Sequence, residues 1–147
     1  MKTVDHWIEK GFVHYADMFV SDRLNQGVDV EFKDIALEVY LQKIKRAAVY
    51  IIVKDGEVLK FGQSANIRQR IFYNYKCVSN STNNFIRENI KERLNRVEFY
   101  VYLIPNEDVE LIGYKFRTNL QKGLEEAILK DYYQTYNTIP ELNRQRN

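Results

Sequence analysis

A chain of 147 residues with 45% hydrophobic and 29% charged residues has the composition of an ordinary folded domain, with enough apolar side chains for a complete core. The formal net charge of +2 is too small to indicate nucleic-acid binding by itself. The single cysteine, Cys77, excludes an intramolecular disulfide, and the sequence shows no signal peptide and no apolar run long enough to cross a bilayer. These features favour a cytoplasmic protein without a membrane partner.

The first 46 residues are predicted to form two helices. Between residues 4 and 19, apolar side chains recur at helical spacing and define one wide stripe: Val4, Trp7, Ile8, Phe12, Tyr15 and Phe19. A second helix is expected from about residue 31 to 45, and the basic residues near its end favour the helix dipole. Residues 1–46 are therefore interpreted as an N-terminal helical extension that packs on the rest of the chain, with a dimer contact or a grip on DNA as alternatives.

Two histidines fall in this extension. His6 and His14 are eight residues apart, which places them two turns apart on one helix and too far from each other for a zinc pair without other ligands. Both are interpreted as surface or interfacial histidines.

The centre of the chain is predicted to form a β-hairpin followed by a helix. Residues 47–54 and 57–62 match the pattern of two strands, and Asp55-Gly56 between them is a strong hairpin signal. Gly62 ends the second strand, and Ser64 can cap a helix that begins at about residue 65.

The length of the hairpin loop decides which side chains share a face. A two-residue loop would place Tyr50 opposite Phe61. A three-residue loop, with Gly56 in the left-handed position of a bulge, would place Tyr50 opposite Lys60. We favour the three-residue loop because it gathers one uninterrupted apolar face: Val49, Ile51, Val53, Leu59 and Phe61.

The remainder of the chain adds helices and a third strand. A polar loop is expected at residues 78–84, followed by a basic amphipathic helix at 85–94. A strand rich in β-branched and aromatic residues is predicted at 96–104, and the last helix at 120–136. The predicted fold class is α/β of the α+β type: a small three-stranded antiparallel sheet flanked by helices, in a domain of residues 47–147 beside the N-terminal helical pair.

The order and spacing of several residues resemble the core motif of the GIY-YIG nucleases. That family reads G-I-Y, about ten residues, Y-I-G, and an arginine eight positions after the last glycine. Here Val49-Tyr50 is followed by Lys60-Phe61-Gly62, with Lys60 ten positions after Tyr50, and Arg70 stands eight positions after Gly62. The family's later glutamate and asparagine have counterparts in Glu125 and Asn137, which are twelve positions apart.

The chain departs from the family pattern at three positions. Ala48 replaces the first glycine. Lys60 replaces the second tyrosine, at a position where some phage and bacterial branches of the family also carry lysine. The position four after the arginine, often histidine or tyrosine in the family, is Asn74.

The resemblance implies an endonuclease that uses Mg²⁺ or Mn²⁺ to cut DNA, with RNA as another substrate class, and that can act as a homo-oligomer. It implies that Tyr50 orients or deprotonates water, that Lys60 is a neighbouring cation or base, and that Arg70 holds the phosphate. Glu125 would bind the metal, and Asn137 would order the helix end or reach a phosphate. The alternative, which Lys60 favours, is a catalytically degenerate member that binds nucleic acid or a protein partner without cutting.

Basic residues concentrate between Lys60 and Arg96, where eight lysines and arginines stand against two glutamates. This stretch is a candidate phosphate-facing surface, although a solvated helix face would have the same composition. The candidates for nucleic-acid binding are its basic and aromatic residues: Arg68, Tyr73, Tyr75, Lys76, Arg87 and Lys91.

Overall fold

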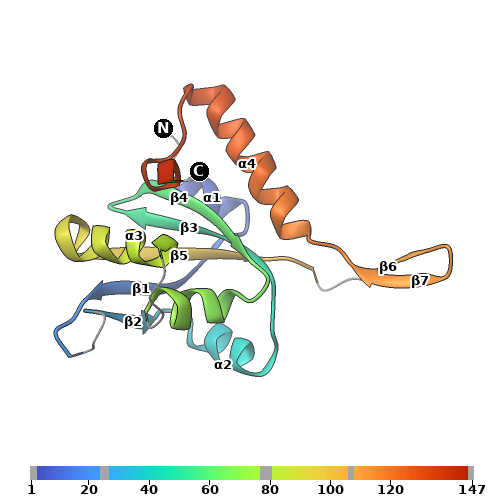
Figure 1. Ribbon diagram of the computed structural model, residues 1–147, viewed down its shortest axis with the longest axis horizontal. Helices are drawn as coiled ribbons and strands as arrows, with labels where there is room; N and C mark the ends of the chain where they lie inside the picture. Colours follow the sequence, from blue (N-terminus) through green and yellow to red (C-terminus); the bar gives the residue numbers. More distant parts are fainter. Residues whose placement is uncertain (1–2, 24–26, 77–80, 106–107, 146–147) are drawn as a thin grey trace.

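The computed structural model describes residues 3–23, 27–76, 81–105 and 108–145. Its main feature is a five-stranded antiparallel sheet of strand order β2-β1-β5-β3-β4, with a separate two-stranded hairpin, β6-β7, projecting from the body (Figure 1). The strands are β1 Val13–Val20, β2 Val28–Phe32, β3 Ala48–Lys54, β4 Glu57–Ser64, β5 Arg96–Leu103, β6 Asp108–Leu111 and β7 Tyr114–Arg117. The helices are α1 Val4–Glu9, α2 Ile35–Lys43, the π-helix η1 Gln69–Tyr75, α3 Ser81–Asn89, the π-helix η2 Ile90–Leu94, α4 Leu120–Tyr136 and the 3₁₀-helix η3 Glu141–Gln145.

Both faces of the sheet are covered, so strand β3 is buried along its length up to Lys54. One face packs against α2, η1, α3 and η2, and its core includes Tyr50, Ile71 and Ile90. The other face packs against α1 and α4, and its core includes Trp7, Phe61 and Tyr132. Burial on two faces explains why β3 reads as a nearly continuous apolar run.

The prediction of a three-stranded sheet with an N-terminal helical pair is wrong. The first helix ends at Glu9, and residues 13–20 form strand β1, which pairs with β2 on one side and β5 on the other. The apolar side chains that suggested one helical stripe instead serve two different faces of the sheet, and pairing on both edges of β1 overrides the helical period. The expected second helix is present but shorter, because the side chain of Asp34 caps α2 by accepting a hydrogen bond of 2.9 Å from Leu37 N.

The predicted three-residue loop between β3 and β4 is also wrong. Asp55 and Gly56 alone form the turn, and both have positive φ, 52° and 80°, as a type I′ turn requires. A bulge at Leu59 then shifts the register, so that Tyr50 pairs with Gly62 and Ile52 with Lys60. Because cross-strand partners share a face, Lys60 still lies on the same face of the sheet as Tyr50.

The second half of the chain follows the prediction more closely. Helix α4 has the predicted bounds, residues 120–136, and β5 coincides with the predicted third strand to within a residue. Residues 81–84, expected in a loop, open helix α3 instead, whereas Cys77 and residues 78–80 lie outside the described residues. The β6-β7 hairpin was not predicted. No helix in the described ranges has the length and apolar character needed to span a bilayer.

A buried asparagine secures the free edge of the sheet. Strand β4 is an edge strand, and the Asn143 side chain mimics a further strand there: its Oδ1 accepts from Phe61 N and its Nδ2 donates to Phe61 O, both at 2.8 Å. Asn143 is completely buried, so its amide is the only route by which these two backbone groups are satisfied among the hydrogen bonds of the described chain.

We predict that Asn143→Ala lowers the free energy of unfolding by about 2–4 kcal/mol, because it leaves two buried backbone groups unpaired. Chemical denaturation monitored by circular dichroism measures the loss. Asn137→Gly is the matched control: Asn137 is exposed with φ 57°, a conformation that glycine also accepts, so the change should be within about 0.5 kcal/mol. A loss at Asn143 no larger than in the control would contradict this role.

Candidate functional site

The site is built around the ring of Tyr50 on strand β3. This ring lies across Gly62 of the neighbouring strand so closely that a Cβ atom on Gly62 would stand 2.2 Å from Tyr50 Cζ and 2.4 Å from its hydroxyl oxygen. Gly62 does not have positive φ, so glycine is required here for space and not for backbone conformation. The tyrosine and the glycine of the motif are therefore one structural unit.

The Tyr50 hydroxyl is hydrogen-bonded to the Tyr75 hydroxyl at 2.5 Å. Tyr75 comes from helix η1, and the two rings pack edge to face with centroids 6.1 Å apart. Both side chains are buried, with exposed fractions of 2% and 0%. Burial is the main cause that raises the pKa of each phenol, so both hydroxyls stay protonated at neutral pH.

Arg70 and Glu125 act electrostatically on both phenols. The positive charge of Arg70 lowers the pKa of Tyr50 and of Tyr75, while the negative charge of Glu125 raises both, although burial remains the larger influence. Arg70 belongs to η1, and Glu125 is a buried carboxylate on α4, 8% exposed. These four residues from three elements, Tyr50, Arg70, Tyr75 and Glu125, are called the tyrosine cluster below.

Sequence spacing did not identify Tyr75 as the partner of Tyr50. The position four after Arg70 is Asn74, but η1 is a π-helix, in which hydrogen bonds join residues five apart. The residue one turn beyond Arg70 is therefore Tyr75. A π-turn inserts one residue without a clear sequence signal, so the pattern alone could not show this shift.

Lys60 and Asn137 differ in their relation to the cluster. Lys60 is half-buried on β4, on the same sheet face as Tyr50. Asn137 is exposed and caps the C-terminus of α4 in a left-handed conformation, with its N–H donating to Tyr133 O at 2.7 Å. Twelve residues of helix separate it from Glu125, about 18 Å along the axis, so its side chain does not reach that carboxylate.

The six predicted nucleic-acid-binding residues divide into two groups. Tyr75 and Arg87 are buried, and the Arg87 guanidinium donates to the carbonyls of Asn74 and Tyr75, which fixes the end of η1. The other four are at least partly accessible: Arg68 pairs with Glu38 at 3.1 Å, Lys76 with Asp29 at 3.1 Å, Lys91 with Glu88 at 3.6 Å, and Tyr73 is 51% exposed.

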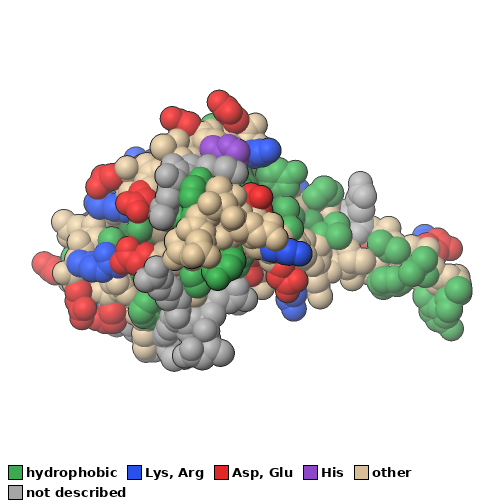
Figure 2. All heavy atoms as spheres, turned by 90° about the horizontal axis from the view of Figure 1, so that it is seen from above, with side chains coloured by type: hydrophobic (Ala, Val, Ile, Leu, Met, Phe, Trp, Pro, Cys, Tyr) green, Lys and Arg blue, Asp and Glu red, His purple; other side chains and the backbone are tan. Residues whose placement is uncertain are grey.

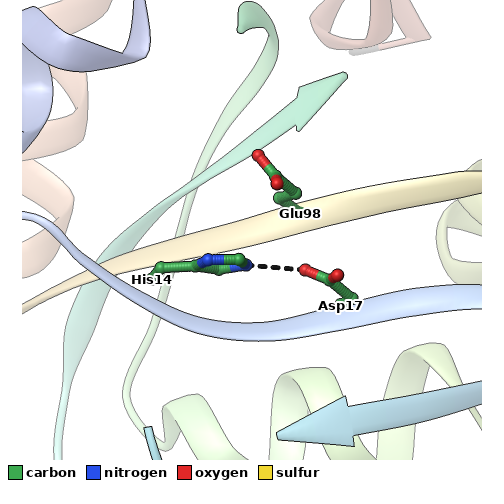
Figure 3. Close-up of side chains that lie close together, drawn as sticks. All are labelled: His14, Asp17 and Glu98. Carbon is green, nitrogen blue, oxygen red and sulfur yellow. Dashed lines mark hydrogen bonds and ion pairs between the residues drawn. The ribbon is translucent and has the colours of Figure 1, made fainter. Parts of the chain in front are cut away.

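A second constellation could hold a metal ion. His14, Asp17 and Glu98 each offer a ligand atom, and these atoms lie within 4.8 Å of one another on strands β1 and β5 (Figure 3). The sequence analysis missed this group because it placed His14 on a helix and considered it only with His6. In the sheet, Asp17 stands directly opposite Glu98 on the neighbouring strand.

The surroundings of this second group are cationic. Asp17 is already bonded to His14 Nε2 at 2.6 Å and to Arg96 Nη2 at 2.8 Å, and Lys33 Nζ lies 3.9 Å away. Because Asp17 pairs with Glu98 and Val53 also pairs with Glu98, the group lies on the face of the sheet opposite to Tyr50. It is therefore separate from the tyrosine cluster, and a cation there would compete with Arg96 for Asp17.

Comparison with solved structures identifies the fold. The chain matches restriction endonuclease HPY188I in complex with product DNA with a TM-score of 0.60 and 20% identity, covering 95% of this chain and 84% of that one. It matches a mutant of bacteriophage T4 EndoII with a TM-score of 0.63 and 19% identity, covering 96% of this chain and 98% of that one. The chain has the fold of the GIY-YIG endonucleases. No family model and no curated protein matches the sequence.

The tyrosine cluster of this GIY-YIG fold predicts an alkaline instability. A phenol whose pKa is raised in the folded state stabilises the fold fully below its unfolded pKa of about 10, and this contribution is lost as the pH rises through the folded pKa. The free energy of unfolding should therefore fall above about pH 10, by up to roughly 1.4 kcal/mol per pH unit for each buried phenol. Tyr75→Phe should make this slope shallower in urea titrations between about pH 9 and 11.5, and an unchanged slope would contradict the assignment.

Proposed function

We propose that the chain is a metal-dependent endonuclease that hydrolyses the phosphodiester bonds of DNA. The observation that carries the proposal is the convergence of two phenols, a guanidinium and a buried carboxylate in the fold of the GIY-YIG endonucleases. A solved structure of one protein with this fold, HPY188I, contains product DNA, which supports DNA as the substrate.

Glu125 fits a divalent cation by its chemistry. Mg²⁺ and Mn²⁺ prefer oxygen ligands, and a single protein carboxylate suffices for Mg²⁺ when substrate phosphate and water complete the shell. When bound at Glu125, the ion would offset the charge of the phosphate and acidify a bound water. The His14 group is the weaker candidate for this reaction because it lies on the other face of the sheet and its Asp17 is already paired with Arg96.

Arg70 is assigned to the scissile phosphate. Its Nε is buried and has no hydrogen-bond partner within the described part of the chain. A buried donor of this kind is costly unless a ligand satisfies it, and the planar guanidinium matches the geometry of two phosphate oxygens. Arg70 would stabilise the negative charge that develops on the phosphate as water attacks.

Tyr50 is assigned to the attacking water. Its phenol is protonated at neutral pH, so it orients the water by hydrogen bonding, while Tyr75 fixes the direction of the Tyr50 hydroxyl. Lys60 supplies a positive charge on the same sheet face, which would favour loss of a proton from that water. Asn137 is too far along α4 to join this step, and we assign to Asn143 the structural task of holding the motif strand.

The four accessible basic and aromatic residues are assigned to binding DNA. Arg68 lies over the ring of Phe72 at 4.7 Å, and Lys76 lies 4.7 Å from the same ring. This packing holds two cations at one end of η1, close in sequence to Arg70. Lys91 and Tyr73 extend the surface and add a charge and a ring on which a base can stack.

The test is cleavage of supercoiled plasmid with Mg²⁺ by the native chain and by Glu125→Ala. We expect nicking or linearisation by the native chain and a loss of at least about a hundredfold in rate in the variant, because the metal ligand is removed. Glu126→Ala is the matched control: Glu126 is the next residue and exposed, so cleavage should be unchanged.

The same experiment decides between the two readings of Lys60. If the native chain binds DNA but cuts neither plasmid nor RNA with Mg²⁺ or Mn²⁺, the endonuclease proposal fails, and the chain is a module that binds nucleic acid without cutting. Equal loss of cleavage in Glu125→Ala and Glu126→Ala would instead remove Glu125 from the site.

A further inference from the structure

The β6-β7 hairpin, residues 108–117, is an arm with one apolar face that the chain itself does not cover. It projects from the end of the body, and Figure 2 shows hydrophobic side chains gathered on it. Cross-strand pairs place four of these side chains on one face of the arm: Val109, Leu111, Tyr114 and Phe116. Leu111 is 58% exposed and Tyr114 71%. A lone two-stranded ribbon is marginally stable in water, so this face requires a partner.

The tip of the arm carries a residue that the turn itself disfavours. Ile112 and Gly113 form the turn with φ of 46° and 84°, a conformation that favours asparagine, aspartate or glycine. The equivalent position in the β3-β4 turn is occupied by Asp55. A β-branched residue in the left-handed region is strained, and Ile112 is also 94% exposed. Strain of this kind points to a task for the isoleucine side chain outside its own chain.

The charge on the arm does not fit nucleic acid. The face opposite the apolar side chains carries two acids and two bases, Asp108, Glu110, Lys115 and Arg117. Asp108 and Arg117 are paired across the strands at 3.4 Å. A balanced surface releases no net counterions from DNA, so the arm fits an apolar protein surface better.

The body of the same chain offers such a surface. A groove of about 370 Å³ lies between α1 and α4, and its walls are mainly apolar side chains: Trp7, Phe12, Tyr102, Leu124 and Ile128. Ala127 and Lys10 are at its exposed rim. The chain therefore carries both an uncovered apolar arm and an uncovered apolar groove.

We propose that the arm of one copy docks in the α1/α4 groove of a second copy, with Ile112 as the anchor, in a two-fold symmetric dimer. Contact between two arms alone would be too small: the apolar face of one arm is roughly 13 Å by 10 Å, against about 800 Å² per partner in a stable interface. Reciprocal docking gives each copy two contact surfaces, its own arm and its own groove, as a closed two-fold arrangement requires. This inference does not depend on the proposed nuclease activity.

The first test is the mass of the native chain by size-exclusion chromatography with light scattering. A dimer has twice the chain mass of 17.6 kDa, about 35 kDa. Ile112→Asn gives the turn a residue that suits it better, so a purely structural role predicts an unchanged or firmer arm. Docking predicts instead that the dimer weakens by roughly tenfold or more for each lost anchor. Ile35→Asn is the matched control because Ile35 is 63% exposed on α2, far in sequence from arm and groove.

A mixing experiment tests the groove separately. Ala127→Arg places a long charged side chain at the groove and should also give a monomer. An equimolar mixture of the two variants should form a heterodimer, because the intact arm of Ala127→Arg can enter the intact groove of Ile112→Asn. A native chain that is monomeric at high micromolar concentration, an Ile112→Asn dimer as stable as the native one, or an Ala127→Arg variant that remains dimeric would overturn the proposal. Each readout is a mass, so it is independent of DNA cleavage.

Discussion

The close passage of the Tyr50 ring over Gly62 is the constraint on which the rest of the site depends. It directs the Tyr50 hydroxyl away from its own strand to Tyr75, and so couples the sheet to helix η1. The same helix carries Arg70, and Arg87 holds its last carbonyls, which fixes the position of the guanidinium relative to the phenols. On the other side of the edge strand, α4 brings the Glu125 carboxylate into electrostatic reach of both hydroxyls.

Burial gives this arrangement its chemical character. Two phenols in a water-poor site remain protonated, so they serve as donors of fixed direction and not as strong bases. The charged work then belongs to Arg70, Lys60 and a cation at Glu125. This division of roles accounts for a lysine at the position where the family has its second tyrosine: a cation on the face of Tyr50 can favour deprotonation of water without a second phenolate.

The sequence predicted the parts of the site that lie on one strand or at one helix face. The spacing from Tyr50 to Gly62 to Arg70 and the helix bearing Glu125 were readable because each depends on local structure. Three features were not readable for physical reasons. Strand β1 is stabilised by pairing on both edges, which local periodicity does not encode. The π-turn of η1 shifts Tyr75 into place, and the bulge at Leu59 changes the register after a correctly located turn.

The central claim is that a divalent cation works at Glu125 and not at His14, Asp17 and Glu98. Crystals grown with a short DNA duplex and Mn²⁺ would locate the ion directly through its anomalous scattering. The account predicts a Mn²⁺ peak within coordination distance of a Glu125 oxygen and of a DNA phosphate beside Arg70. A peak held by His14, Asp17 and Glu98, with none at Glu125, would contradict the account and move the reactive centre to the opposite face of the sheet.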